Sequence, residues 1–178
     1  MRTLRLFVAA YPPVEAAQRW LHAAAAILPP SVRAAPPEQV HVTLVFLGDR
    51  DERELPDIRE SIARSVTGFS PVACQADRLS MLPERGPPRL LAAMLSADPG
   101  LLEIQRRLAQ RLATDRSRKE RFLPHATLAR FAGRQVERTD QRLVDEPFRI
   151  QELRLMRSRL LAGGAEHELD KVFDLHPQ

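Results

Sequence analysis

The chain has 178 residues, with 27 Lys and Arg against 23 Asp and Glu, and a formal net charge of +4. An apolar fraction of 44% and a charged fraction of 28% are ordinary for a soluble globular protein, and the length suits one domain over residues 1–178. The single Cys74 excludes an intramolecular disulfide, favours a reducing compartment, and is expected to pack inertly. The apolar start, residues 6–10, is too short for a signal peptide or a membrane span.

The basic residues are almost all Arg, with Lys119 and Lys171 as the two exceptions. Guanidinium is the better planar donor for phosphate and stacks on bases, which fits a nucleic-acid substrate. The alternative is that the Arg content reflects genome base composition, and this alternative stays open for most individual Arg residues.

The first half of the chain alternates strands and helices. Alternating apolar residues predict a strand over 3–10, and Pro13 is well placed to open the helix that follows. An apolar run predicts a strand over 40–47 that ends at Gly48, and apolar residues at helical spacing predict a helix over 51–66.

The second half repeats this pattern less regularly. The expected elements are strands over 70–79 and 89–95, a helix capped by Asp98, a strand over 123–131, a short helix over 134–144, and a closing hairpin of 147–161 and 168–175 with Gly163-Gly164 in its turn. The order predicts an α+β fold in one bilobal domain. Two pseudo-symmetric antiparallel sheets, each backed by helices, would enclose the active site in the groove between the lobes.

One tetrapeptide pattern occurs twice, as His41-Val42-Thr43-Leu44 and as His125-Ala126-Thr127-Leu128. Each copy lies in an apolar run that is typical of a strand. Because side chains at i and i+2 of a strand share a face, the His and the Thr of each copy point the same way. With five His and six Thr in the chain, composition would give only about 0.17 His-x-Thr triplets. The repeat therefore indicates a function.

Two His-x-Thr pairs suit the chemistry of a phosphate ester. Imidazole has an unperturbed pKa of about 6.5, so one His can take a proton from an attacking water while the other protonates a departing alkoxide. Each Thr hydroxyl can donate a hydrogen bond to a phosphate oxygen. We therefore predict His41 and His125 as catalytic residues and Thr43 and Thr127 as substrate-binding residues, in a scheme that requires no metal.

The sequence alone leaves other interpretations of the two His and the two Thr open. A His in a strand can simply satisfy a backbone carbonyl in the core, and Thr can serve as a strand former. Two His with carboxylates can bind zinc. However, the i+2 positions are Thr, and no Asp or Glu lies within two residues of either His.

The chain resembles the 2H phosphoesterase superfamily, and the residues that flank the motifs resemble its RNA 2′,3′-cyclic phosphodiesterases, also called 2′-5′ RNA ligases. Four blocks carry the resemblance along the whole chain: Arg5 to Ala9, His41 to Gly48, Pro124 to Arg130, and Leu155 to Leu175 with Ser158. The second and third blocks are specific. The resemblance implies the same bilobal fold.

The resemblance also implies hydrolysis of RNA 2′,3′-cyclic phosphate ends to 2′-phosphomonoesters. In that scheme His125 is the base that activates water and His41 is the acid that protonates the O3′ leaving group. The reverse reaction through the same groups would give a 2′-5′ linkage. The implied partners are RNA ends or nucleotides that carry a 2′,3′-cyclic phosphate, the implied further substrate contacts are Arg130 and Phe7, and no cofactor is implied.

Three positions complicate this interpretation. Strict alternation places Arg130 on the face opposite His125, so Arg130 reaches the site only if the strand bends or ends there. Phe7 can stack on a base or belong to the core. This chain has His167 where the family usually has Tyr, which bears on recognition of the base.

The basic loop 114–121 could follow an RNA backbone or could simply be a solvated loop.

Two rival functions share the same residues. One is an RNA- or nucleotide-binding module of this fold without significant turnover. The other is the same chemistry on 2′-5′-linked oligonucleotides or small cyclic phosphates. We expect a cytoplasmic monomer that does not act at a membrane.

Overall fold

The structure, a computed structural model, describes residues 2–114, 121–133, 135–161 and 164–176. The strands of these residues form one antiparallel sheet in the order β6-β3-β4-β5-β2-β1-β8-β9, with β7 also paired to β3. The strands are β1 (Thr3–Ala10), β2 (Val42–Asp51), β3 (Val72–Leu82), β4 (Leu90–Ala97), β5 (His125–Arg130), β6 (Gln141–Arg142), β7 (Phe148–Ile150), β8 (Glu152–Leu161) and β9 (Gly164–Asp174). The helices are α1 (Val14–Ala25), α2 (Leu55–Val66) and α3 (Pro99–Leu112), with short 3-10 turns η1 (Pro37–Gln39) and η2 (Glu52–Glu54).

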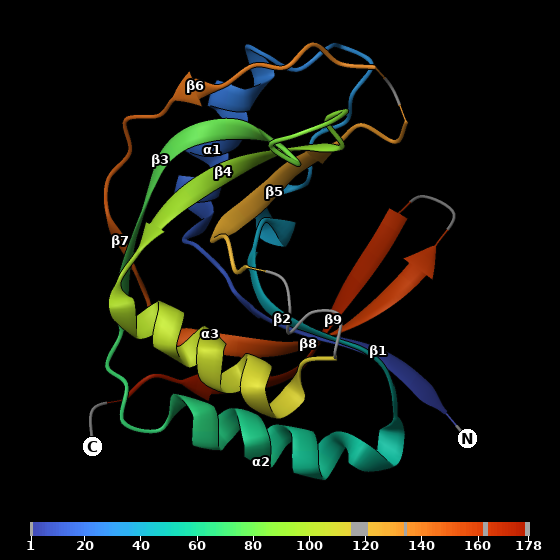
Figure 1. Cartoon of the computed structure of the whole chain (residues 1–178), viewed down its shortest axis with the longest axis vertical. Helices are drawn as coiled ribbons and strands as arrows, with labels where there is room; N and C mark the ends of the chain where they lie inside the picture. Colours follow the sequence, from blue (N-terminus) through green and yellow to red (C-terminus); the bar gives the residue numbers. More distant parts are fainter. Residues whose placement is uncertain (1, 115–120, 134, 162–163, 177–178) are drawn as a thin grey trace.

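The sheet consists of two parts that meet where β2 and β5 pair through Val42 and Ala126. One lobe contains β1, β2, β8 and β9, and α2 and α3 pack on it; the other contains β3 to β7, and α1 packs on it (Figure 1). The predicted α+β fold with two helix-backed antiparallel lobes is confirmed. The sheets of the two lobes are joined edge to edge into one continuous sheet, through the pairing of β2 with β5.

The two lobes do not correspond to the two halves of the sequence. Helix α1 follows β1 but packs near β5 of the other lobe, while α3 follows β4 but packs on β2 (Figure 1). Strand β8, near the end of the chain, pairs with β1 near its start. Each lobe is therefore assembled from segments that are distant in sequence.

The helix-covered face of the sheet carries the main hydrophobic core, which includes Trp20, Leu44, Ile104 and Leu128. Two smaller apolar clusters lie apart from this core. The first contains Phe7, Ala9 and Met156, and the second contains Leu82, Ala92 and Met94. The face that carries these two clusters is called the site face below.

Strand β2 is longer than the sequence predicts. It begins at Val42 rather than at residue 40 and continues to Asp51. The pairing with β1 shifts by one residue at Leu47, resumes where Gly48, with a positive φ of 72°, pairs with Leu6, and runs on to Thr3 opposite Asp51. Helix α2 accordingly begins later, at Leu55, after a 3-10 turn whose capping box joins Asp51 and Glu54.

The predicted short helix over 134–144 is wrong. No helix occurs in the described part of this segment, residues 135–144, and Gln141 and Arg142 instead pair with β3. The guanidinium of Arg138 donates to the carbonyl oxygens of Met81, Pro83 and Gly86. These contacts with a distant strand and loop hold the segment extended.

The predicted closing hairpin is present as β8 and β9, although Gly163 of its turn lies outside the described residues. Residues 115–120 of the basic loop also lie outside them.

Cys74 is a buried free thiol, and burial raises its pKa to about 12, so it stays protonated. None of the described helices has the length and apolarity to cross a bilayer.

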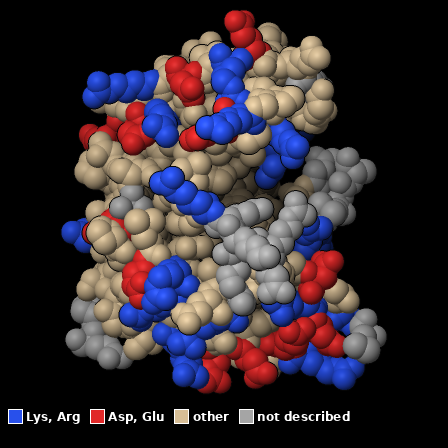
Figure 2. Space-filling view, viewed as in Figure 1, with Lys and Arg blue, Asp and Glu red and all other residues tan. Residues whose placement is uncertain are grey.

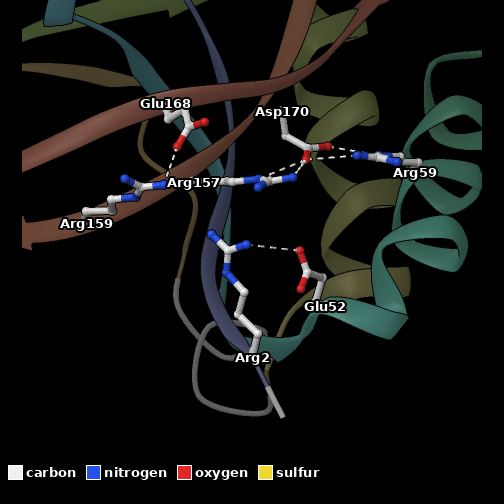
Figure 3. A network of polar contacts seen from close by, with 7 residues as sticks. All are labelled: Arg2, Glu52, Arg59, Arg157, Arg159, Glu168 and Asp170. Carbon is white, nitrogen blue, oxygen red and sulfur yellow. Dashed lines mark hydrogen bonds and ion pairs between the residues drawn. The ribbon is translucent and has the colours of Figure 1, made fainter.

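A buried ion-pair network attaches the hairpin to helix α2 (Figure 3). The carboxylate of Asp170, fully buried on β9, accepts two hydrogen bonds of 2.9 Å from Arg59 of α2 and one of 3.0 Å from the Nε of Arg157 on β8. Burial alone would raise the pKa of Asp170, but the hydrogen bonds from both guanidiniums outweigh it and hold this pKa below its usual value.

Candidate active site

The two His-x-Thr motifs meet at the junction of the lobes. Val42 of one motif pairs with Ala126 of the other in antiparallel orientation, so the His and Thr of both motifs lie on either side of this one pair. All four side chains are half-buried, whereas Val42 and Ala126 between them are buried in the main core.

Both imidazoles are held in the same way. The Nδ1 of His41 lies 2.6 Å from the carbonyl oxygen of Gln39, and the Nδ1 of His125 lies 2.7 Å from the carbonyl oxygen of Leu123. A carbonyl only accepts, so in both rings Nδ1 carries the proton and donates it. The Nε2 atoms of the two rings are therefore the atoms that can accept or, once protonated, donate a proton.

Each motif is followed by a β-bulge at the same position. Thr43 pairs with Ala9 and Val45 with Val8, so Leu44 is the extra residue of β2. In β5, Thr127 pairs with Ala92 and Ala129 with Leu91, so Leu128 is the extra residue. A bulge shifts the alternation of side chains beyond it by one residue.

The bulges bring two further side chains to the site face. Val45 and Ala129, which strict alternation would place beside the Thr, are buried in the main core instead. Phe46 and Arg130, the next residues, consequently share the face of the His and Thr. Phe46 contacts the Phe7 ring at 6.0 Å and is 56% exposed, and the charge of Arg130 acts on both His41 and His167.

The carbonyl groups of both extra residues have partners from outside the pairing strands. The Leu44 oxygen accepts from the Nε2 of Gln105 on α3 at 3.3 Å, and the Leu128 oxygen accepts from the backbone N–H of Ala35 at 2.7 Å. Satisfying a buried carbonyl removes the cost that a bulge would otherwise carry. Gln105 and the loop at Ala35 thus help to hold the two bulges.

His41 is packed among aromatic rings. Its centroid lies 5.2 Å from Phe7, 5.4 Å from Tyr11 and 5.1 Å from His167, the last in an edge-on arrangement. Phe7 is 2% exposed, so its ring is covered in this structure. The Nδ1 of His167 is buried and has no hydrogen-bond partner among the described residues.

Burial lowers the pKa of His41 to about 4. The hydrogen bond to Gln39 opposes this change, and the charges of His167, Arg130 and His125 add to it. Burial also lowers the pKa of His167, with a further contribution from Arg130. Without a bound anion, His41 is therefore neutral at pH 7, and the guanidinium of Arg130 that acts on it is positive.

The structure thus brings together His41, Thr43, His125, Thr127 and Arg130, and places Phe7 beneath them. The sequence alone does not predict Phe46 or Tyr11 at the site, and it indicates His167 only as a departure from a family pattern. A signal for Phe46 exists, because it follows Thr43 by three residues, as Arg130 follows Thr127. Nothing local signals Tyr11 or His167, whose positions depend on packing between strands.

In the part of the chain that the structure describes, no three His, Cys, Asp or Glu side chains gather as metal ligands. The charged residues on the face in Figure 2 are mixed in sign, with Asp and Glu beside Lys and Arg.

The fold and the two motifs define a class of protein, a bilobal α+β protein with paired His-x-Thr strands where its lobes meet. The model of the 2′-5′ RNA ligase superfamily matches residues 12–162, and the chain belongs to this superfamily.

Relatives and solved structures agree with this assignment. The RNA 2′,3′-cyclic phosphodiesterase of Thermus thermophilus is 28% identical over 181 residues, covering 97% of this chain and 90% of that protein. The one of Archaeoglobus fulgidus is 26% identical, covering 80% and 84%. The crystal structure of TT0787 from Thermus thermophilus superposes with a TM-score of 0.84 at 27% identity, over 98% of this chain and 100% of that one. Escherichia coli LigT bound to NADP+ shares the fold, with a TM-score of 0.79 at 23% identity, over 98% and 99%.

Proposed function

We propose that this chain is a metal-independent phosphodiesterase that opens 2′,3′-cyclic phosphates at RNA ends and leaves 2′-phosphomonoesters. The names of its relatives support a phosphodiesterase acting on RNA cyclic phosphates. The observation that carries the proposal is the matched pair of imidazoles. His41 and His125 each donate Nδ1–H to a backbone carbonyl, which leaves two Nε2 atoms for proton transfer at the junction of the lobes.

In the proposed reaction, the phosphate lies between the two rings. The Nε2 of His125 takes a proton from water as the water oxygen bonds to phosphorus. The bond from phosphorus to O3′ breaks, and the protonated Nε2 of His41 gives its proton to O3′. The products are a 3′-hydroxyl and a 2′-phosphomonoester, and the same path with the 5′-hydroxyl of another strand in place of water would form a 2′-5′ linkage.

The remaining side chains on the site face suit the other parts of the substrate. The hydroxyls of Thr43 and Thr127 and the guanidinium of Arg130 can donate to the non-bridging phosphate oxygens. Phe46 offers an exposed ring on which a base can stack, whereas Phe7 supports that ring from below. Phosphate recognition would thus come from both motifs, and base recognition from the aromatic side of the site.

The acid role of His41 requires a change in its pKa. In the free protein burial holds this pKa at about 4, which favours the neutral ring. A phosphate anion placed beside it offsets the positive charge of Arg130 and stabilises the protonated form, so its pKa must rise on binding.

We expect an NMR titration to find His41 near pKa 4 in the free protein and at least about 2 units higher with a 2′-phosphorylated nucleotide bound. His22, an exposed residue of α1, serves as the control and should not respond to the nucleotide. A His41 pKa that stays near 4 in the complex would mean that His41 is the base and His125 the acid.

Gln105 provides a prediction about the bulge of β2. Gln105→Met keeps the size of the side chain but removes the donor to the Leu44 carbonyl, a loss of about 1 kcal/mol. If the bulge loosens, Phe46 is less well placed, and we expect the affinity for a 2′-phosphorylated nucleotide to fall about fivefold by calorimetry, with less effect on inorganic phosphate.

Gln110→Met is the matched control, because Gln110 lies on the same helix, is exposed, and accepts a hydrogen bond from Arg106 of α3. It should leave both affinities unchanged. Equal affinities for Gln105→Met and the unmodified protein would exclude a role of the Gln105 hydrogen bond in the site.

The proposed function is tested by incubating purified protein, with EDTA, with RNA oligonucleotides that end in a 2′,3′-cyclic phosphate. The product isomer is then identified by chromatography against 2′- and 3′-phosphate standards. We expect a 2′-phosphate. A 3′-phosphate product would overturn the assignment of O3′ as leaving group, and binding without turnover would favour the non-catalytic module.

A further inference from the structure

A cavity of about 430 Å³ opens beside Tyr11, where β1 ends. This volume is in the range of small-molecule sites. Its walls come from the end of β1, the turn η1, and the segment that joins β7 to β8. The residues that line it include Tyr11, Glu38, Val40, Arg149, Glu152 and Arg154.

The cavity adjoins the catalytic histidine on the side away from Phe46. The rings follow one another as Phe46, Phe7, His41 and Tyr11, with successive centroids 6.0, 5.2 and 5.4 Å apart. Val40, the residue before His41, also lines the cavity. In this sequence of ring contacts Phe46 is at one end and Tyr11, which lines the cavity, is at the other, with His41 between them.

The chemistry of a ribose end matches this arrangement. A 2′,3′-cyclic phosphate sits on the C2′–C3′ edge of the ribose. The base leaves from C1′ at one end of that edge, and the 5′-linked chain leaves from C4′ at the other. With the phosphate at His41 and the base on Phe46, the preceding nucleotide is directed toward Tyr11.

The polar groups of the cavity are arranged for a neutral nucleoside with one phosphodiester. The guanidinium of Arg154 lies 4.7 Å from the Tyr11 ring centroid, and its Nε donates to Glu152 at 2.7 Å, so it presents a fixed plane. Its two terminal nitrogens have no hydrogen-bond partner among the described residues. Arg149 adds a second guanidinium, and Glu38 and Glu152 balance both positive charges. Burial raises the pKa of Tyr11 to about 12, against the effect of Arg154, so its hydroxyl remains a donor.

We infer that this cavity is a second subsite, which binds the nucleotide on the 5′ side of the terminal cyclic phosphate and makes the protein prefer oligonucleotides to cyclic mononucleotides. The inference rests on the proposed function, because it takes the position of the phosphate from it. It identifies the substrate class as a strand of at least two nucleotides.

The test compares two substrates for each protein variant. One is a 2′,3′-cyclic mononucleotide with a free 5′-hydroxyl, and the other is a dinucleotide that ends in the same cyclic nucleotide. The unmodified protein should show a kcat/KM about tenfold higher for the dinucleotide. Arg149→Gln and Arg154→Gln should each lower this ratio, and together they should bring it close to one.

Arg64→Gln is the control for lost charge, because Arg64 is an exposed residue of α2 that pairs only weakly with Glu60 at 3.8 Å. It should leave the ratio unchanged. Equal kcat/KM for both substrates in the unmodified protein would overturn the subsite alone, as would a dinucleotide preference that survives both substitutions. Turnover of neither substrate would overturn the proposed function, and the subsite with it.

Discussion

His41→Ala and His125→Ala are each expected to lower kcat by about 10³-fold on an RNA 2′,3′-cyclic phosphate, the usual scale for losing a general acid or base. The double variant should be little slower than either single variant, because groups that act on one phosphate as a unit have non-additive effects. Single-turnover kinetics with saturating enzyme would separate this loss of chemistry from any change in binding.

His22→Ala is the matched control for these variants, because it removes an exposed imidazole from α1 without touching the site face. Its kcat should equal that of the unmodified protein. Retained turnover in the His41 and His125 double variant would contradict the mechanism, whereas retained binding of a 2′-phosphorylated nucleotide would agree with it.

Asp170→Asn is expected to lower the free energy of unfolding by about 3 kcal/mol, measured by urea denaturation at pH 7. The substitution keeps the shape of the side chain but leaves Arg59 and Arg157 facing a neutral group that is fully buried (Figure 3). This loss lies at the low end of the range of about 3–5 kcal/mol for breaking a buried ion pair, because both guanidiniums keep contact with water.

Glu168→Gln on the same strand supplies the comparison. Its ion pair with Arg159 is exposed on both sides, so its loss should cost less than about 0.5 kcal/mol (Figure 3).

The pH dependence of the Asp170 effect follows from its folded-state pKa, which lies below the usual value of an Asp. The stability that the ionised carboxylate contributes is therefore fully present above the usual pKa and is lost as the pH falls through the folded-state pKa. The difference between Asp170→Asn and the unmodified protein should therefore be constant from pH 5 to pH 7. A difference as small as that of Glu168→Gln would contradict this account.

The local part of the site is predictable from the sequence. The period of two in a strand places His41 with Thr43, and His125 with Thr127, whatever the rest of the fold does. The apolar residues between them fix which face is buried. The same rule fails for Arg130 and Phe46, because the bulges at Leu44 and Leu128 depend on partner strands and on outside donors.

The helix that the sequence predicts over 134–144 does not form in its described part, residues 135–144, for a similar reason. Its local pattern allows a helix, but pairing with β3 and the three carbonyls that Arg138 binds hold it extended. Tertiary contacts of this kind routinely override weak local preferences.

By itself, the sequence determined that this protein has two equivalent His-x-Thr strands within a helix-backed α+β fold, because those features follow from local periodicity and side-chain chemistry. The tertiary structure alone decided that the two motifs meet at Val42 and Ala126, that Arg130 and Phe46 turn to their face, and that Tyr11 and His167 pack on His41. These relations join residues far apart in the chain through strand pairing and burial. Their energies belong to the assembled sheet, so no single segment can encode them.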